Sequence, residues 1–138
     1  MTDNLAESIG RLGIFADLTR SERQALADEL AEESFAEGRW ILRQGGGRAG
    51  LYIIVEGEVG VIVDDEERAT LATGSFFGEV SVLLGEPPTA GIVTRSALRC
   101  LVIQPDEVEE FLLAHPRVMY RMLQTEVRRL RTADPERN

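Results

Sequence analysis

The chain has 138 residues, of which 43% are hydrophobic and 28% charged, a size and balance that suit one globular domain with its own core. Its formal net charge of −9 disfavours binding to nucleic acid or to an anionic membrane surface. No apolar run is long enough to span a membrane, the N-terminus lacks the order of a signal peptide, and the one cysteine excludes an internal disulfide. We therefore expect a cytoplasmic location.

The N-terminal part of the chain is expected to form helices within residues 1–33. Apolar residues recur at helical spacing from Leu5 to Phe15. Residues 21–24, Ser-Glu-Arg-Gln, match a capping box in which the serine and glutamine side chains satisfy backbone groups at a helix start. We expect this second helix to run to about Leu30.

Residues 34–104 change to the pattern of short strands separated by glycine-rich turns. The strand candidates are Phe35, 40–42, 51–55, 59–63, 69–71, 92–94 and 97–103. We expect hairpin turns at Glu56-Gly57 and at Asp64-Asp65-Glu66. Short strands at such close spacing predict a small sandwich or barrel.

The helical period returns in residues 105–134, before a short tail at 135–138. Pro105 suits a first helical position, Pro116 restarts the helix after a break, and Pro135 ends it. Apolar residues from Val118 to Leu130 recur every three or four positions, which predicts one long amphipathic helix.

The most distinctive stretch lies between two predicted strands, at residues 74–90. It reads Gly-Ser-Phe-Phe-Gly-Glu-Val-Ser-Val-Leu-Leu-Gly-Glu-Pro-Pro-Thr-Ala. We expect a loop, a helical turn at 78–84 and a second loop. Glycines flank Glu79, and the free N–H groups at the start of the turn would face one point. That geometry suits an anion next to a polyol.

This stretch resembles the phosphate-binding cassette of the cyclic nucleotide-binding domain family. The matching positions are Phe77, Gly78, Glu79, Ser81, Leu84, Gly85, Pro87, Thr89 and Ala90. Motifs such as Gly38-x-x-Ile41 and Leu51-Tyr52-Ile53-Ile54 extend the resemblance over roughly residues 10–131. It implies an α+β fold, a jelly-roll-like β-roll (double-stranded β-helix) flanked by N-terminal and C-terminal helices.

The resemblance also implies a ligand site for cyclic AMP or cyclic GMP. Its residues would be Phe77, Gly78, Glu79, Val80, Ser81, Pro88, Thr89 and Ala90. Glu79 would accept a hydrogen bond from the ribose 2′-hydroxyl, and the alternative is that it caps its own helical turn. Ser81 would either contact the ligand or bond back within its helix. Thr89 would tolerate either purine, and its other role is strand entry.

Pro88 stands where the family has its phosphate-clamping arginine. The substitution removes a guanidinium and also a backbone N–H. Loss of a two-bond clamp on a charged group costs on the order of 100-fold or more in affinity. Arg95 and Arg99 lie close in sequence and are the candidates to swing in as replacements. A second departure is that Gly46 and Gly47 follow Gly45 where the family has an acidic residue, so we expect a floppier loop.

In the family the C-terminal helix forms a lid over the base and often a dimer seam. Here Val118, Met122, Val127 and Leu130 suit a lid, a homodimer seam or core packing against the β-roll. The basic end Arg128-Arg129-x-Arg131 favours the helix C-terminus, and we expect it to be a solvated face. Ala133 and Asp134 lie near where some members contact the base. No helix-turn-helix segment follows, so we expect no direct DNA binding by this chain.

These observations favour a non-catalytic sensing or regulatory module that binds cyclic nucleotides, or another small anion, weakly or in an altered way. The alternative is a protein-interaction domain that keeps the fold and binds no cyclic nucleotide. An enzyme of the cupin type fits poorly, because His115 is the sole histidine and an imidazole-rich metal site is excluded. Cys100 lies in an apolar strand and suits a buried structural thiol. No nucleophile with a neighbouring base is visible.

Overall fold

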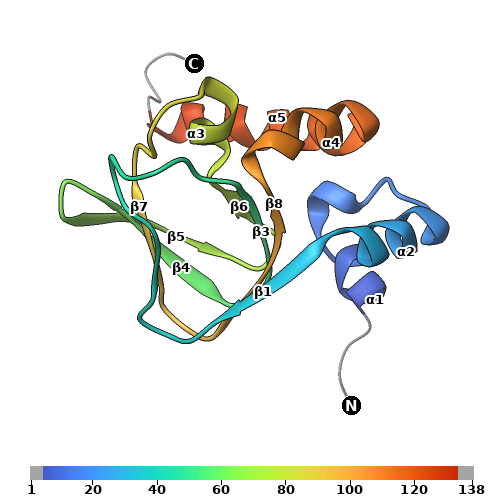
Figure 1. The fold of residues 1–138 in the computed structure, drawn as a ribbon, viewed down its shortest axis with the longest axis horizontal. Helices are drawn as coiled ribbons and strands as arrows, with labels where there is room; N and C mark the ends of the chain where they lie inside the picture. Colours follow the sequence, from blue (N-terminus) through green and yellow to red (C-terminus); the bar gives the residue numbers. More distant parts are fainter. Residues whose placement is uncertain (1–4, 134–138) are drawn as a thin grey trace.

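The computed structural model describes residues 5–133, in which a β-roll is flanked by helices from both ends of the chain (Figure 1). The expectations for Asp134, for Pro135 and for the tail lie outside the described residues. The N-terminal elements are α1 (Leu5–Gly10), the 3-10 turn η1 (Gly13–Phe15) and α2 (Arg20–Glu29). The C-terminal elements are the 3-10 turn η2 (Pro105–Glu107), α4 (Val108–Ala114) and α5 (Pro116–Ala133).

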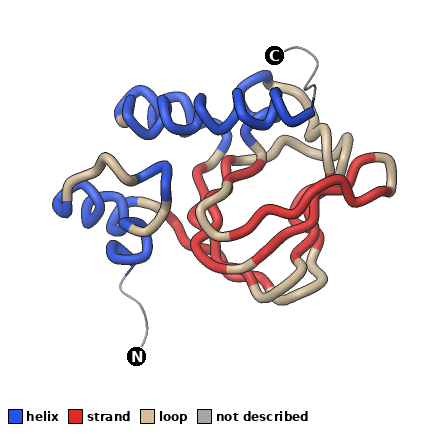
Figure 2. Tube along the Cα trace, turned by 180° about the vertical axis from the view of Figure 1, so that it is seen from behind, coloured by secondary structure: helices blue, strands red, loops and turns tan. Residues whose placement is uncertain are grey.

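The β-roll consists of two four-stranded antiparallel sheets, in the orders β1-β8-β3-β6 and β2-β7-β4-β5. The strands are β1 (Ala31–Phe35), β2 (Trp40–Leu42), β3 (Leu51–Glu56), β4 (Glu58–Val63), β5 (Glu66–Ala72), β6 (Phe76–Phe77), β7 (Gly91–Thr94) and β8 (Leu98–Ile103). The short helix α3 (Glu79–Leu84) lies between β6 and β7. Strands gather in one body, with helices beside it and along one end (Figure 2). This confirms the predicted fold class.

Strand β8 contributes side chains to two hydrophobic cores, one on each face of its sheet. Alternate side chains of a strand point to opposite faces. Leu101 and Ile103 pack with the N-terminal and C-terminal helices, whereas Cys100 and Val102 pack inside the roll. Cys100 is fully buried, and burial raises the pKa of its thiol to about 12. It is therefore a structural thiol, as predicted.

The two predicted hairpin turns have different outcomes. Asp64 and Asp65 have φ angles of 52° and 66° and join β4 to β5, which pair from Val63 and Glu66 onward. This is a two-residue hairpin of the type that requires left-handed backbone at both positions. The expected hairpin at Glu56-Gly57 is wrong, because β3 and β4 belong to different sheets and the turn instead carries the chain between them.

The predicted capping box is also wrong, and the real one lies two residues earlier. Thr19 is the N-cap of α2: its hydroxyl accepts from the Glu22 N–H at 3.2 Å, and the Glu22 carboxylate accepts from the Thr19 N–H at 2.8 Å. Ser21 therefore lies inside the first turn. A carboxylate is a stronger acceptor than the amide of Gln24, which explains the preference.

Two strand boundaries depend on pairing that the local sequence does not reveal. β1 starts at Ala31, three residues before the expected strand region, because Ala31 to Phe35 pair with Val102 to Leu98 of β8. The two-residue strand β6 was expected as a loop, but Phe76 and Phe77 pair with Ile53 and Tyr52 of β3. This pairing anchors the start of the cassette to the roll.

Candidate ligand-binding site

The predicted helical turn of the cassette is present, and glycines make it possible at both ends. Gly78 is the N-cap of α3 with a φ of 88°, and Gly85 is the C-cap with a φ of 67°. A Cβ at position 78 would collide with the carbonyl oxygen of Gly50, so a side chain is excluded by both strain and space. Figure 1 shows α3 next to the C-terminal half of α5, at one end of the β-roll.

The cassette forms one wall of a cavity of about 850 Å³. All eight predicted site residues line it: Phe77, Gly78, Glu79, Val80, Ser81, Pro88, Thr89 and Ala90. The strands supply an apolar wall from Leu42, Val61, Val63, Ala69, Leu71 and Ile92. The remaining lining residues are polar or charged and come from β5 and α5: Arg68, Thr125, Arg128, Arg129 and Thr132. The cavity thus combines a broad apolar surface with a few placed polar groups, as ligand sites do.

Glu79 is the buried carboxylate of this cavity, with 7% of its surface exposed. Its Oε2 accepts from Arg129 Nη1 at 2.9 Å, a partner that the sequence did not point to. Burial, reinforced by the neighbouring Glu126 carboxylate, raises the pKa of Glu79 to about 7, and the charge of Arg129 lowers it in part. An ion pair with α5 therefore holds the side chain that we expected to bind a ligand hydroxyl or to cap its own helix.

Arg129 joins α5 to the cassette through several contacts at once. Nη2 donates to the Phe76 carbonyl at 2.8 Å and to Ser75 Oγ at 3.0 Å, and Nη1 also donates to Glu126 at 3.0 Å. The guanidinium lies over the Phe76 ring, 4.4 Å from its centroid. The expectation of a solvated basic face is therefore wrong for Arg129. No local pattern could have shown this, because Glu79 and Arg129 are 50 residues apart.

The alternative in which Ser81 bonds back within its own helix is wrong. Its buried hydroxyl donates to the Glu86 carbonyl at 2.5 Å, outside its own helix, and accepts from the Ala49 N–H at 3.5 Å. These contacts fold the end of the cassette back onto α3. Ser81 lines the cavity, but its proton is already used to hold the loop.

Pro88 is buried, and its carbonyl accepts from the Gly45 N–H at 2.8 Å. The glycine-rich loop is thus tied to the cassette instead of hanging free. In the same loop Gln44 exchanges two hydrogen bonds with Asp64, through its Nε2 at 3.1 Å and its Oε1 at 2.8 Å. The loop is therefore held both to the cassette at Pro88 and to the β4–β5 turn at Asp64.

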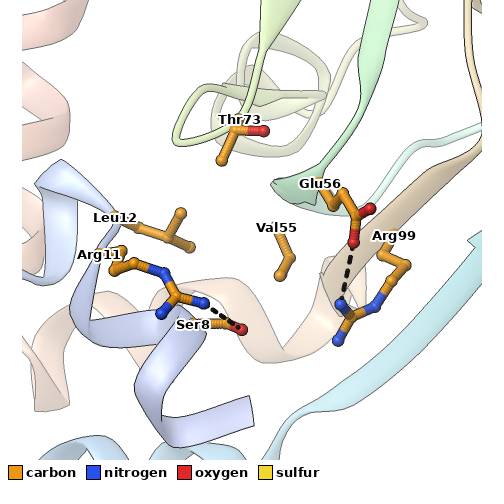
Figure 3. A pocket seen from close by; sticks show the side chains of 7 residues that line it. All are labelled: Ser8, Arg11, Leu12, Val55, Glu56, Thr73 and Arg99. Atoms are coloured by element: carbon orange, nitrogen blue, oxygen red, sulfur yellow. Dashed lines mark hydrogen bonds and ion pairs between the residues drawn. The ribbon is translucent and has the colours of Figure 1, made fainter. Parts of the chain in front are cut away.

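The two arginines proposed to replace the missing clamp are occupied elsewhere. Arg95 pairs with Glu67 at 2.6 Å, and Arg99 pairs with Glu32 at 2.7 Å and with Glu56 at 3.2 Å. Figure 3 shows Arg99 facing Glu56 in a separate cavity of about 260 Å³, across from α1. Neither Arg95 nor Arg99 lines the large cavity, so the structure does not support this replacement. The arginines of the large cavity come from β5 and α5, far from Pro88 in the sequence.

The C-terminal helix divides its apolar residues between two roles. Val118 and Met122 are buried in the core that one face of the β-roll forms with the flanking helices, as the alternative of packing against the β-roll predicted. Val127 and Leu130 are 57% and 56% exposed, so they are not part of that core. Ala133 is the last residue of α5 that the structure describes.

The described residues contain neither a membrane-spanning helix nor a metal-binding cluster, the features of two other classes of protein. Between residues 5 and 133, no helix is long and apolar enough to cross a membrane. Within the same range, no group of three or more His, Cys, Asp or Glu side chains is arranged to hold a metal ion.

The fold and the cavity define a β-roll ligand-binding domain closed by a C-terminal helix. A sequence model of the cyclic nucleotide-binding domain matches residues 32–115. The chain therefore belongs to the cyclic nucleotide-binding domain family. It is 32% identical over 95 residues to a cGMP-dependent protein kinase of Plasmodium berghei (strain Anka). That match covers 69% of this chain and only 11% of the kinase, so the chain spans a small part of that relative.

Solved structures agree on the fold. The catabolite activator protein of Thermus thermophilus superposes with a TM-score of 0.77 at 26% identity, over 89% of this chain and 60% of that one. PKAR CBD2 bound to Sp-2Cl-cAMPS superposes with a TM-score of 0.76 at 20% identity, over 93% and 88% of the two chains. At that identity the second likeness shows the fold alone.

Proposed function

We propose that this chain is a non-catalytic sensing module that binds a cyclic nucleotide, cyclic AMP or cyclic GMP, in the 850 Å³ cavity. The observation that carries the proposal is the convergence of all eight predicted residues on one cavity that also holds a buried carboxylate, Glu79. Regulatory members of the family match this chain in fold, which supports a binding role.

The hydroxyl-binding half of the cavity is centred on Glu79. A carboxylate oxygen accepts a hydroxyl proton strongly, and a partly desolvated site strengthens the bond. The apolar residues of β4, β5 and β7 provide a surface on which a flat heterocyclic ring can pack. Ala90 is small and intermediate in exposure, so it leaves room beside that surface.

The phosphate-binding half is weaker, because Pro88 supplies neither a cation nor an N–H. Arg68 and Arg128 line the same cavity, and Glu79 is the one acidic residue among the lining residues that the structure describes, so this described lining is positively charged in a chain of net charge −9. Both side chains are exposed, and Arg68 has a long contact of 3.4 Å with Glu66. We propose that they attract the anion without clamping it, which gives weak binding.

Calorimetric titration of the native chain and of Pro88→Arg with cyclic AMP and cyclic GMP tests the proposal. We expect weak binding by the native chain and at least a tenfold gain for the variant, because a bidentate arginine contributes about 1.5–3 kcal/mol per charged hydrogen bond. Sub-micromolar affinity of the native chain would show that Pro88 does not weaken the site. A folded Pro88→Arg variant that binds neither nucleotide would refute the nucleotide-binding function itself.

The exposed apolar stripe of α5 favours a second candidate, an interaction module. Tyr120, Leu123, Val127 and Leu130 are each more than half exposed and follow a three-four spacing along one helix. This spacing suits a homodimer in which two copies of α5 pack together. Sedimentation of the native chain and of Leu123→Glu tests it: a dimer that the variant disrupts supports the second role, and a native monomer at high concentration excludes it.

A further inference from the structure

A second cavity, of about 260 Å³, lies where the N-terminal segment meets strands β3 and β8, and Figure 3 shows the residues that line it. None of these residues lines the large cavity, so the two cavities are separate. A water molecule occupies about 30 Å³ of the liquid, so the volume equals that of about nine waters. The cavity therefore suits a small molecule with roughly that number of non-hydrogen atoms.

Two side chains of this cavity have hydrogen-bond donors without acceptors. Ser8 is 3% exposed and its Oγ accepts from Arg11 Nη2 at 3.4 Å, but among the described residues no group accepts the proton of this hydroxyl. Arg99 donates from Nε to Glu32 at 2.7 Å and from Nη1 to Glu56 at 3.2 Å, and within the described part of the chain its Nη2 has no acceptor. A buried hydroxyl without an acceptor is costly, and a guanidinium N–H binds anionic oxygens strongly, so these donors favour an anionic group in the cavity.

A carboxylate lies directly beside these donors. Glu56 Oε2 accepts from Arg99, whereas Oε1 has no donor among the described residues, and the side chain is 68% exposed. Glu56 and Glu32 both oppose the negative charge of a simple anion at Arg99. A ligand with an ammonium next to its own anionic group removes this conflict, because the ammonium can donate to Glu56. An α-amino acid has this arrangement, since both of its charged groups are bonded to one carbon.

Part of the cavity wall is apolar. Leu12 and Val55 line it and are 1% and 6% exposed, and both belong to the core between the helices and the β-roll. Their side chains offer no hydrogen bond, so this part of the wall suits an aliphatic group of the ligand.

We propose that this cavity is a second ligand site, which takes a small aliphatic α-amino acid as the zwitterion. The ligand carboxylate accepts from the Ser8 hydroxyl and from Arg99 Nη2, and the ligand ammonium donates to Glu56. The aliphatic side chain packs on Leu12 and Val55. Binding here does not depend on a cyclic nucleotide in the large cavity.

Titration of the native chain with L-valine, followed by amide NMR and without any nucleotide, tests the proposal. We expect saturable shifts at Ser8, Val55 and Thr73, which line this cavity, and none at Ala90 of the large cavity. Two analogues each lack one charged group: 3-methylbutanoate has no ammonium, and isobutylamine has no carboxylate. Each should bind at least about tenfold more weakly, because each loses a hydrogen bond between charged groups.

Glu56→Gln should weaken L-valine at least about tenfold and leave 3-methylbutanoate no weaker, because the variant removes the charged acceptor of the ammonium. Glu67→Gln is the matched control, since Glu67 also pairs with an arginine, Arg95 at 2.6 Å, but does not line this cavity. It should change neither affinity. Ser8→Ala should weaken L-valine and 3-methylbutanoate by a similar factor, because both carry the carboxylate.

Three results would overturn the proposal. The first is no saturable binding of L-valine to the native chain up to its highest soluble concentration. The second is an affinity for 3-methylbutanoate equal to that for L-valine, which would make the cavity a simple anion site. The third is an equal loss in Glu56→Gln and Glu67→Gln. Each result leaves the proposed cyclic nucleotide site unaffected, since the two cavities share no lining residue.

Discussion

Around Glu79 the cavity wall is stabilised by an ion pair between side chains, whereas around Pro88 it is stabilised by a backbone hydrogen bond. Arg129 brings α5 onto the Glu79 carboxylate through a charged pair at 2.9 Å. Pro88 instead offers only its carbonyl, which accepts from the Gly45 N–H at 2.8 Å. The hydroxyl-binding half therefore has a fixed acceptor, and the phosphate-binding half has no donor at the position where the family has a guanidinium.

We infer from this difference that the two halves of the proposed site can change independently. The Glu79 half depends on contacts across 50 residues of sequence, so it persists only while α5 and the cassette stay compatible. The Pro88 half depends on a single position, where one substitution can remove the positive charge of the family's arginine without disturbing the loop. Under the proposed function, recognition of a hydroxylated ring can thus be kept while binding of the anion is weakened.

The largest expected effect is at Gly78, because a substitution there would disturb α3 and with it both the Glu79 side and the Pro88 side of the cavity. Gly78→Ala places a Cβ against the Gly50 carbonyl at a φ of 88°, so we expect a loss of at least about 2 kcal/mol in unfolding free energy, measured by urea denaturation. Gly74→Ala is the control, since its φ of 91° carries similar strain in open space. Equal losses for the two variants would show that the close approach does not matter.

The next largest effect is a pH dependence of the unfolding free energy, which we expect to arise at Glu79 and not at Pro88. The pKa of Glu79 is raised from 4.5 to about 7 in the folded chain, so the folded state holds this proton more tightly than the unfolded state. Its contribution to stability is present below pH 4.5 and is lost as the pH rises through 7. We expect the native unfolding free energy to fall more between pH 5 and pH 8 than that of Glu79→Gln.

Glu109→Gln, on the exposed surface of α4, is the control for this pH experiment. It should keep the native pH dependence. If Glu79→Gln also keeps it, then the carboxylate at Glu79 is not the group that titrates in this range.

The smallest expected effect concerns the arginines that remain near the phosphate half. Arg128→Ala should weaken cyclic AMP about threefold at low salt, because an exposed charge contributes less than about 1 kcal/mol. Adenosine, which lacks the phosphate, should bind equally to the native chain and the variant. The difference should vanish at high salt, and a salt-independent loss would mean that Arg128 acts through packing.

The fold was predictable from the sequence because its signals are local. Gly78 and Gly85 mark the ends of α3, Pro105 and Pro116 mark helix starts, and the Asp64-Asp65 pair marks a true hairpin. The prediction of a hairpin at Glu56-Gly57 was wrong, because the sequence of a glycine turn does not show whether it joins strands of one sheet or strands of two sheets.

The site was predictable only in part, because its charges are placed by tertiary packing. All eight cassette residues line one cavity, as the family resemblance implied. The partner of Glu79 could not be identified from the sequence, because the local sequence around Arg129 does not differ from that of a solvent-exposed arginine near a helix end. Arg95 and Arg99 were candidates only because they are close to Pro88 in sequence, and proximity in sequence says little about which sheet face a strand residue occupies.

The loop at Gln44-Gly45 has a consequence for the positions of the β4–β5 hairpin and the cassette. Gln44 fastens the tip of the β4–β5 hairpin, and the next residue fastens the cassette at Pro88. Two adjacent residues of one loop, Gln44 and Gly45, therefore connect the β4–β5 turn to the cassette, so the positions of these two segments depend on each other.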